Sequence, residues 1–200
     1  MNRYLLITII ALLSFGKSYS QLPNGSIAPD FTLTDINGTV HTLYNYTNQG
    51  YTVFIHFEAV WNPPGWSYHQ TGALENLYVN HGPNGYPNVN STTTDDVMVI
   101  FIEGDQSPLS CIGGTGCGTV GDWITGTSYP IICTDGTVNN DDVVTTYSIA
   151  YYPTIYQVCP DRTLTLAGQT SNPYPLVSSC STTPTWDCDG QGNCSDPGTG

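Results

Sequence analysis

The cysteines are the residues of this sequence that could most clearly take part in a reaction, and there are seven of them. Cys111 and Cys117 enclose five residues of a Gly-rich stretch, a spacing that suits a local disulfide loop. The alternative is an exposed redox pair that exchanges with other thiols. Cys133 ends an apolar run, so it either stays buried and inert or competes for one of those two. The odd count predicts a free thiol, a bond to another chain, or a partner outside this sequence.

Histidines and one glutamate are the other candidates for acid–base or metal chemistry. Glu58 either lies buried with a raised pKa, as happens in functional clefts, or is hydrogen-bonded or solvated, which we expect. His56 alternates with apolar neighbours and is expected to be a core group with its hydrogen bonds satisfied. The four histidines are His41, His56, His69 and His81, and their spacing is not that of metal ligands. We therefore expect no metal and no cofactor.

The N-terminus and the charge balance indicate a secreted protein. Arg3 is followed by an apolar run of about a dozen residues and then by small residues of the kind found at a cleavage site. This pattern predicts a signal peptide over residues 1–20. Removing it takes Arg3 and Lys17 away and leaves one cation, Arg162, against 16 acidic residues, a net charge of −15. One cation cannot neutralise phosphates, so nucleic acid and anionic membrane surfaces are excluded as partners. No later segment is long and apolar enough for membrane insertion.

The elements that must position these residues follow from hydrophobic patterns. Asn37-Gly38 predicts a tight turn in an N-terminal hairpin, and the apolar run Val97 to Ile102 is typical of a buried parallel strand. The order of elements predicts an α/β sandwich with a mixed central sheet. Other expected elements are strands at 51–57, 129–133, 155–159 and 164–167, a helix at 65–79, and short helices at 120–124, near 141–149 and at 175–180.

We expect one domain over residues 21–180, a linker at 181–185, and the start of a cysteine-rich repeat at 186–200 that continues beyond Gly200. Asp187, Asp189 and Gly192 partly fit a calcium loop, a minority alternative because Gly198 stands where a bidentate glutamate belongs. The tail resembles repeats of modular secreted bacterial proteins, so we expect further domains of the same chain.

Four stretches resemble the thioredoxin-like redoxin family, of the TlpA/ResA and AhpC/TSA types. They are "GSIAPDFTLTDINGTVHTL", "YTVFIHFEAVWNPPGW", "VMVIFIEGD" and "YSIAYYPTIYQVCPDRTL", and they span about residues 25 to 170. The resemblance implies a thioredoxin-like sandwich with an N-terminal β-hairpin and flanking helices. It also implies a role in cell redox homeostasis and a cis peptide bond before Pro153.

In that family a cysteine at a helix N-terminus attacks a disulfide as a thiolate, and a second cysteine resolves the product. Carried over, the first position is Asn62, the second is Gly65, and the cis-proline is Pro153. Asparagine forms no thiolate, so the CxxC motif has degenerated to Asn-Pro-Pro-Gly and we expect no catalytic residue here. Asn62 is expected to cap the helix instead, with Pro63 at its first position. Returning cysteine to 62 and 65 should then restore some activity.

The resemblance also places the remaining disulfides. Cys159 ends the strand that begins at Pro153, and the closing helix returns to Cys180, so we expect these two to be bonded. Such a bond would stabilise the fold by about 3 kcal/mol. A Cys188–Cys194 bond is the further expectation for the tail.

Aromatic residues and prolines around the degenerate motif predict a binding groove for an extended peptide or a glycan. We therefore expect a non-catalytic binding or structural module of a larger extracellular or cell-surface bacterial protein, with the periplasm as the other possible location. The alternative is a thiol-disulfide oxidoreductase or peroxidase-like redoxin that uses Cys111, Cys117 or Cys133. The expected groove residues are Trp61, Pro63, Pro64, Trp66, Tyr152 and Pro153, with Tyr68 and Tyr151 also converging there.

Overall fold

The computed structural model describes residues 21–135, 139, 142–180, 187–188 and 194–195. The predicted signal peptide, the predicted linker and the side chains of the predicted Cys188–Cys194 bond lie outside the described residues. The helices are α1 (Leu43–Asn48), α2 (Pro63–His69), α3 (Ala73–His81), α4 (Leu109–Ile112), α5 (Asp142–Thr146) and the 3-10 helix η1 (Tyr174–Ser179). The strands are β1 (Thr32–Thr34), β2 (Val40–Thr42), β3 (Thr52–Glu58), β4 (Val97–Glu103), β5 (Ile131–Cys133), β6 (Thr154–Val158), β7 (Leu164–Leu166), β8 (Asp187–Cys188) and β9 (Cys194–Ser195).

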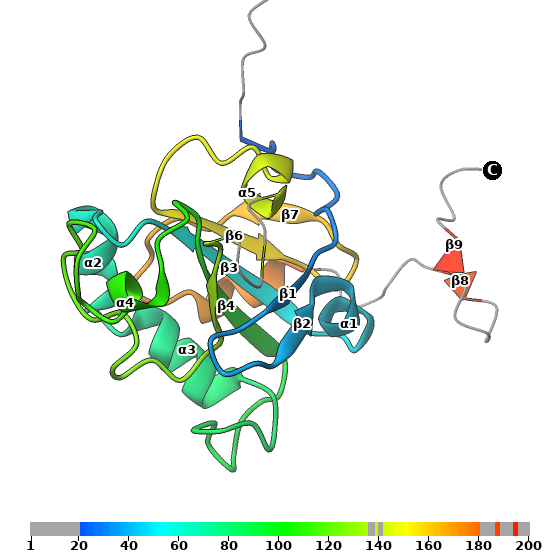
Figure 1. The fold of residues 1–200 in the computed structure, drawn as a ribbon. Coiled ribbons are helices and arrows are strands. Elements are labelled where there is room, and N and C mark those ends of the chain that lie inside the picture. Colours follow the sequence, from blue (N-terminus) through cyan, green and yellow to red (C-terminus); the bar gives the residue numbers. More distant parts are fainter. Residues whose placement is uncertain (1–20, 136–138, 140–141, 181–186, 189–193, 196–200) are drawn as a thin grey trace, which may run out of the picture.

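A five-stranded mixed sheet in the order β5-β4-β3-β6-β7 forms the centre of the molecule. β3 pairs in parallel with β4 and antiparallel with β6, while β1 and β2 form a separate antiparallel hairpin. In Figure 1, α2 and α3 lie along one side of this sheet and α1 lies on the other. The α/β sandwich with a mixed sheet and an N-terminal hairpin is thus confirmed.

Alternation along β3 assigns its side chains to two packed faces. His56 packs against Phe101 of β4 and Tyr68 of α2, with ring centroids 5.3 and 6.2 Å apart. Phe57, one residue on, faces Tyr147 on the opposite side of the sheet, at 5.2 Å. Every residue of β3 and β4 is buried, which explains their nearly continuous apolar sequences.

Two helix predictions need correction. The helix expected at 65–79 is two helices: α2 ends at His69, and the chain turns before α3, whose N-cap Gly72 has a left-handed φ of +67°. The helix expected at 120–124 is absent from that described segment. Gly113 and Asp122 instead form a bridge, and the Trp123 N–H donates to the Ile112 carbonyl, so this part of the insert is extended against α4.

Candidate functional site

The start of α2 lies at the carboxyl end of β3, where the degenerate motif was expected. Asn62 holds the N-cap position with extended backbone, and its carbonyl accepts a hydrogen bond from the Trp66 N–H at 3.0 Å. Pro63 and Pro64 occupy the first turn of the helix, as predicted for Pro63. The helix therefore begins where the sequence predicted.

The side chain of Asn62 does not cap the helix, contrary to the prediction. Its amide Nδ2 instead donates to Oε1 of Glu58 at 2.9 Å, and Asn62 is buried. Two features explain the difference. Pro64 has no N–H for a cap to bind, and a hydrogen bond to a carboxylate is stronger than one between neutral groups.

Glu58, the last residue of β3, is completely buried. Its carboxylate receives hydrogen bonds from the Ala59 N–H at 2.9 Å and from Asn62, and it pairs with Nε2 of His56 at 3.2 Å. The expected hydrogen-bonded glutamate is confirmed, and three neighbouring groups offset the cost of burying it. The site that resembles a redox centre is therefore a closed polar network.

Gly65 completes this arrangement, because the carboxylate of Glu58 lies against its Cα. A Cβ atom at position 65 would meet Oε2 of Glu58 at 1.6 Å, well inside any real contact distance. Glu58 thus occupies the space that a side chain at position 65 would need. That cysteines at 62 and 65 restore activity stays a prediction, and the carboxylate of Glu58 would have to move or be replaced to admit a side chain at position 65.

His56 is the one member of the network with an unmet requirement. Nε2 contacts Glu58, but the buried Nδ1 has no hydrogen-bond partner among the described residues. The expectation of a fully satisfied core histidine is therefore wrong for one ring nitrogen. The imidazole packs edge-on against the Tyr68 and Phe101 rings.

The surface beside the start of α2 is aromatic. Trp61 is 45% exposed, and its ring packs edge-on against Tyr152 with a centroid distance of 6.4 Å. Its Nε1 donates to Asp105 at 2.5 Å, and the neighbouring Tyr151 is 52% exposed. The Tyr152–Pro153 bond is cis, the geometry that the family resemblance predicted.

Two aromatic residues that were expected at this surface lie elsewhere. Trp66 packs against His69 and Trp123, with centroids 5.3 and 4.9 Å away, because the backbone of Gly121 approaches its ring closely. Tyr68 is buried against His56, and its hydroxyl donates to the Thr170 carbonyl. Both belong to the packing of α2 against the sheet and the insert rather than to an exposed groove.

No protein-family model and no curated protein matches the sequence. Among solved structures, the thioredoxin domain of a thiol-disulfide oxidoreductase from Bacteroides vulgatus matches with a TM-score of 0.53 and 18% identity, covering 79% of this chain and 97% of that one. A thiol:disulfide interchange protein from Bacteroides sp. matches with a TM-score of 0.50 and 18% identity, covering 86% and 96%. This chain has the thioredoxin fold.

The fold alone does not assign a reaction. Thiol-disulfide exchange also depends on where the sulfur atoms lie. Cys111 and Cys117 form a disulfide in the insert after β4, and Cys159 and Cys180 form a second one, as expected for both pairs. Cys133 is the free cysteine of the described residues. Its thiol donates to the Ser107 carbonyl at 3.0 Å, and burial raises its pKa to about 11. A thiol with this pKa is almost entirely protonated at neutral pH and is a poor nucleophile.

Glu103 is a residue of this thioredoxin fold that the sequence analysis passed over. It ends β4 directly opposite Glu58 in the strand register, and it is completely buried. It accepts hydrogen bonds from the N–H groups of Asp105 and Ser107, yet burial raises its pKa to about 7. A lone glutamate closing a continuous apolar run was the signal that could have revealed it.

Other chemistry is limited in the part of the chain that the structure describes. No group of three or more His, Cys, Asp or Glu side chains there is arranged to hold a metal ion. No helix among the same residues combines the length and apolar character needed to cross a bilayer. His69 packs between Trp66 and Trp123, and burial lowers its pKa to about 4, which keeps it neutral.

Proposed function

We propose that this chain is a secreted thioredoxin-fold module of a larger bacterial protein that binds a partner without catalysing thiol-disulfide exchange. One observation carries the proposal: Glu58 fills the space beside Gly65 and holds the amide of Asn62. Of the two positions at which the resembling enzymes carry cysteine, Asn62 is thus hydrogen-bonded to a carboxylate and Gly65 is packed against that carboxylate.

The partner in this proposal is an extended peptide that lies on the exposed surface of Trp61, Tyr151 and Tyr152. Aromatic side chains of this kind supply large contact area at low entropic cost and are enriched in binding surfaces. The hydrogen bond from Trp61 to Asp105 fixes the indole in one orientation before binding. The cis-proline beside this surface supports the assignment, because in the resembling enzymes it shapes the groove for substrate.

A turnover assay tests the absence of catalysis. Reduction of insulin disulfides by dithiothreitol, followed by turbidity, should proceed at the uncatalysed rate with the wild-type protein. A variant with Glu58→Ala, Asn62→Cys and Gly65→Cys should accelerate it more than Asn62→Cys with Gly65→Cys alone. Acceleration by the wild-type protein would contradict the proposal.

Peptide binding is tested with the carboxamidomethylated B chain of insulin, which is extended and has no free thiol. Titration should quench tryptophan fluorescence, and Trp61→Ala should lose binding as measured by calorimetry. Leu166→Ala is the control, because Leu166 is an exposed apolar residue of β7 outside this surface. Equal affinity of the wild-type and Trp61→Ala proteins would contradict the assignment of the surface.

A second candidate function is thiol-disulfide exchange through the Cys111–Cys117 bond. Cys117 is exposed, and the insert that carries it hydrogen-bonds to Val60 beside the site, through the Val120 N–H at 3.0 Å. Cys111 is buried, so a thiolate would have to attack the bond from the side of Cys117. Wild-type turnover that disappears in a Cys111→Ser, Cys117→Ser, Cys133→Ser variant would establish this function in place of the first.

A further inference from the structure

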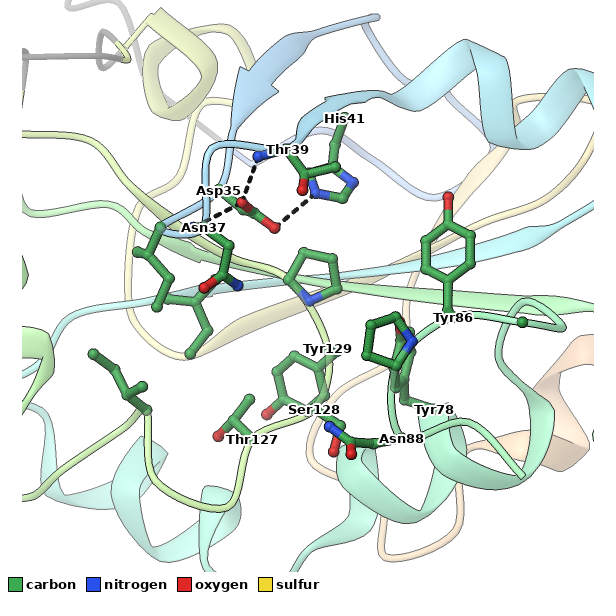
Figure 2. A pocket seen from close by; sticks show the side chains of 16 residues that line it. Asp35, Asn37, Thr39, His41, Tyr78, Tyr86, Asn88, Thr127, Ser128 and Tyr129 are labelled. Carbon is green, nitrogen blue, oxygen red and sulfur yellow. Dashed lines mark hydrogen bonds and ion pairs between the residues drawn. The ribbon is translucent and has the colours of Figure 1, made fainter. Parts of the chain in front are cut away.

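A concave site lies away from the candidate site and shares no residue with it. It is a cavity of about 580 Å³ between the turn of the β1–β2 hairpin, the loop after α3, and the segment that leads into β5. Figure 2 shows Asn37 on one wall and Tyr86 and Asn88 on the wall that faces it. This volume lies within the range of cavities that bind small molecules.

The hairpin wall is held by one carboxylate. Oδ1 of Asp35 accepts hydrogen bonds from the N–H groups of Asn37 and Thr39 at 2.9 and 2.8 Å, and Oδ2 pairs with Nε2 of His41 at 3.1 Å. The other ring nitrogen of His41 contacts the hydroxyl of Tyr46 at 2.6 Å. The turn that presents Asn37 is therefore fixed before any ligand arrives.

The facing wall is also fixed by hydrogen bonds. Asp95 accepts from the Asn84 N–H at 2.8 Å and from the Tyr51 hydroxyl at 2.7 Å, and Thr93 donates to the carbonyl of Gly82 at 2.6 Å. These contacts hold both ends of the loop that carries Tyr86. Because both walls are preorganised, a ligand would lose less free energy to ordering the protein on binding.

The chemistry of the lining selects a class of ligand. The side-chain amides of Asn37 and Asn88 are exposed and make no hydrogen bond with another described residue. Each offers two donors and one acceptor, which matches a ligand rich in hydroxyl groups. Tyr86 is 38% exposed and supplies an aromatic surface for the C–H face of a ring.

Charged ligands fit the cavity less well. None of its described lining residues is a lysine or arginine, and both ring nitrogens of the lining residue His41 already contact Asp35 and Tyr46, so the lining offers an anion no free cationic partner. An organic cation is recognised by several ring faces together. Tyr78 and Tyr129 are only 1% and 4% exposed, which leaves Tyr86 as the single well-exposed tyrosine ring of the lining.

We propose that this cavity binds a neutral saccharide. The ring of the sugar stacks on Tyr86, and its hydroxyl groups exchange hydrogen bonds with the amides of Asn37 and Asn88. The proposal is independent of the redox question, because none of these residues belongs to the network around Glu58.

Saturation-transfer NMR with the methyl glycosides of glucose, galactose and mannose tests the proposal on the whole protein. At least one of them should bind with a millimolar dissociation constant and shift the backbone amide signals of Asn37 and Tyr86. Glucuronate and tetramethylammonium serve as the charged probes and should bind more weakly. No binding of any glycoside at millimolar concentration, or stronger binding of a charged probe, would overturn the proposal.

Matched variants locate the binding. Tyr86→Ala and Asn37→Ala should each weaken it by about tenfold, the effect of losing one good contact, whereas Tyr86→Phe keeps the ring and most of the affinity. Leu166→Ala is the control for Tyr86, since Leu166 is 39% exposed, and Asn45→Ala is the control for Asn37. Circular dichroism confirms that each variant is folded. Unchanged affinity in both cavity variants, or signal shifts centred on Trp61, would overturn the assignment.

Discussion

The start of α2 and the cavity beside the β1–β2 hairpin use the same types of side chain in opposite ways. At the start of α2, a carboxylate and an asparagine amide bind each other and are buried, as Glu58 and Asn62 show. In the cavity, the carboxylate of Asp35 binds the backbone and the asparagine amide of Asn37 faces solvent. A site that resembles an active centre is filled by its own residues, whereas open space for a ligand lies elsewhere on the fold.

The largest effect is expected where the network is most tightly packed. Gly65→Ala places a Cβ against the carboxylate of Glu58, and the displaced acid should lower the free energy of unfolding by about 3 kcal/mol. Urea denaturation measures it. The loss should shrink in a Glu58→Ala background, and Gly113→Ala is the control because its Cβ would meet nothing closer than 3.6 Å. Equal losses in both backgrounds would show that Glu58 does not restrict position 65.

Glu103, which lies opposite Glu58 in the strand register, should make the free energy of unfolding depend on pH. Burial raises the pKa of Glu103 to about 7 from 4.5, so between these values the folded state retains a proton that the unfolded state has released. The free energy of unfolding should therefore fall by about 2 kcal/mol as pH rises from 4.5 to 7, and then level off in this respect. Glu103→Gln should reduce this slope in urea denaturation series. Identical slopes in the wild-type and Glu103→Gln proteins would contradict the prediction.

Asn62→Ala removes a donor from a buried carboxylate without adding bulk. The expected loss is about 1 to 2 kcal/mol, because Glu58 then keeps two of its three partners and one acceptor position is unsatisfied. Thermal and urea unfolding both report it. Asn62→Ser, which can still donate, is expected to lose less, and the opposite ranking would show that the amide does not stabilise the carboxylate.

Asn37→Ala is the corresponding change at the cavity, and it should have the smallest effect on stability. The side chain is exposed and forms no hydrogen bond with another described residue, while the backbone N–H that donates to Asp35 remains. We expect a change within about 0.5 kcal/mol. A loss as large as that of Asn62→Ala would mean that the amide has a structural role and would weaken the contrast between the two sites.

Much of the fold could be predicted from local patterns. The Asn37-Gly38 turn and the continuous apolar run of β4 were apparent in the sequence, whereas the cis bond before Pro153 was implied by the family resemblance. The helix expected at 65–79 was wrong because its apolar residues continue past Gly72, although α2 ends at His69 and the chain turns before α3. Hydrophobic periodicity reports which side chains are buried, not where the backbone turns between them.

The sequence by itself determined that no thiolate can form at positions 62 and 65, because that depends only on residue type. Tertiary structure decided what replaces it. Whether Asn62 caps its helix or binds Glu58 depends on how closely α2 lies over the end of β3, and the space beside Gly65 depends on the same distance. The cavity was equally hidden, because its walls come from three segments that are distant in the chain. Local preferences fix which elements form, whereas contacts between distant segments exist only after those elements have packed.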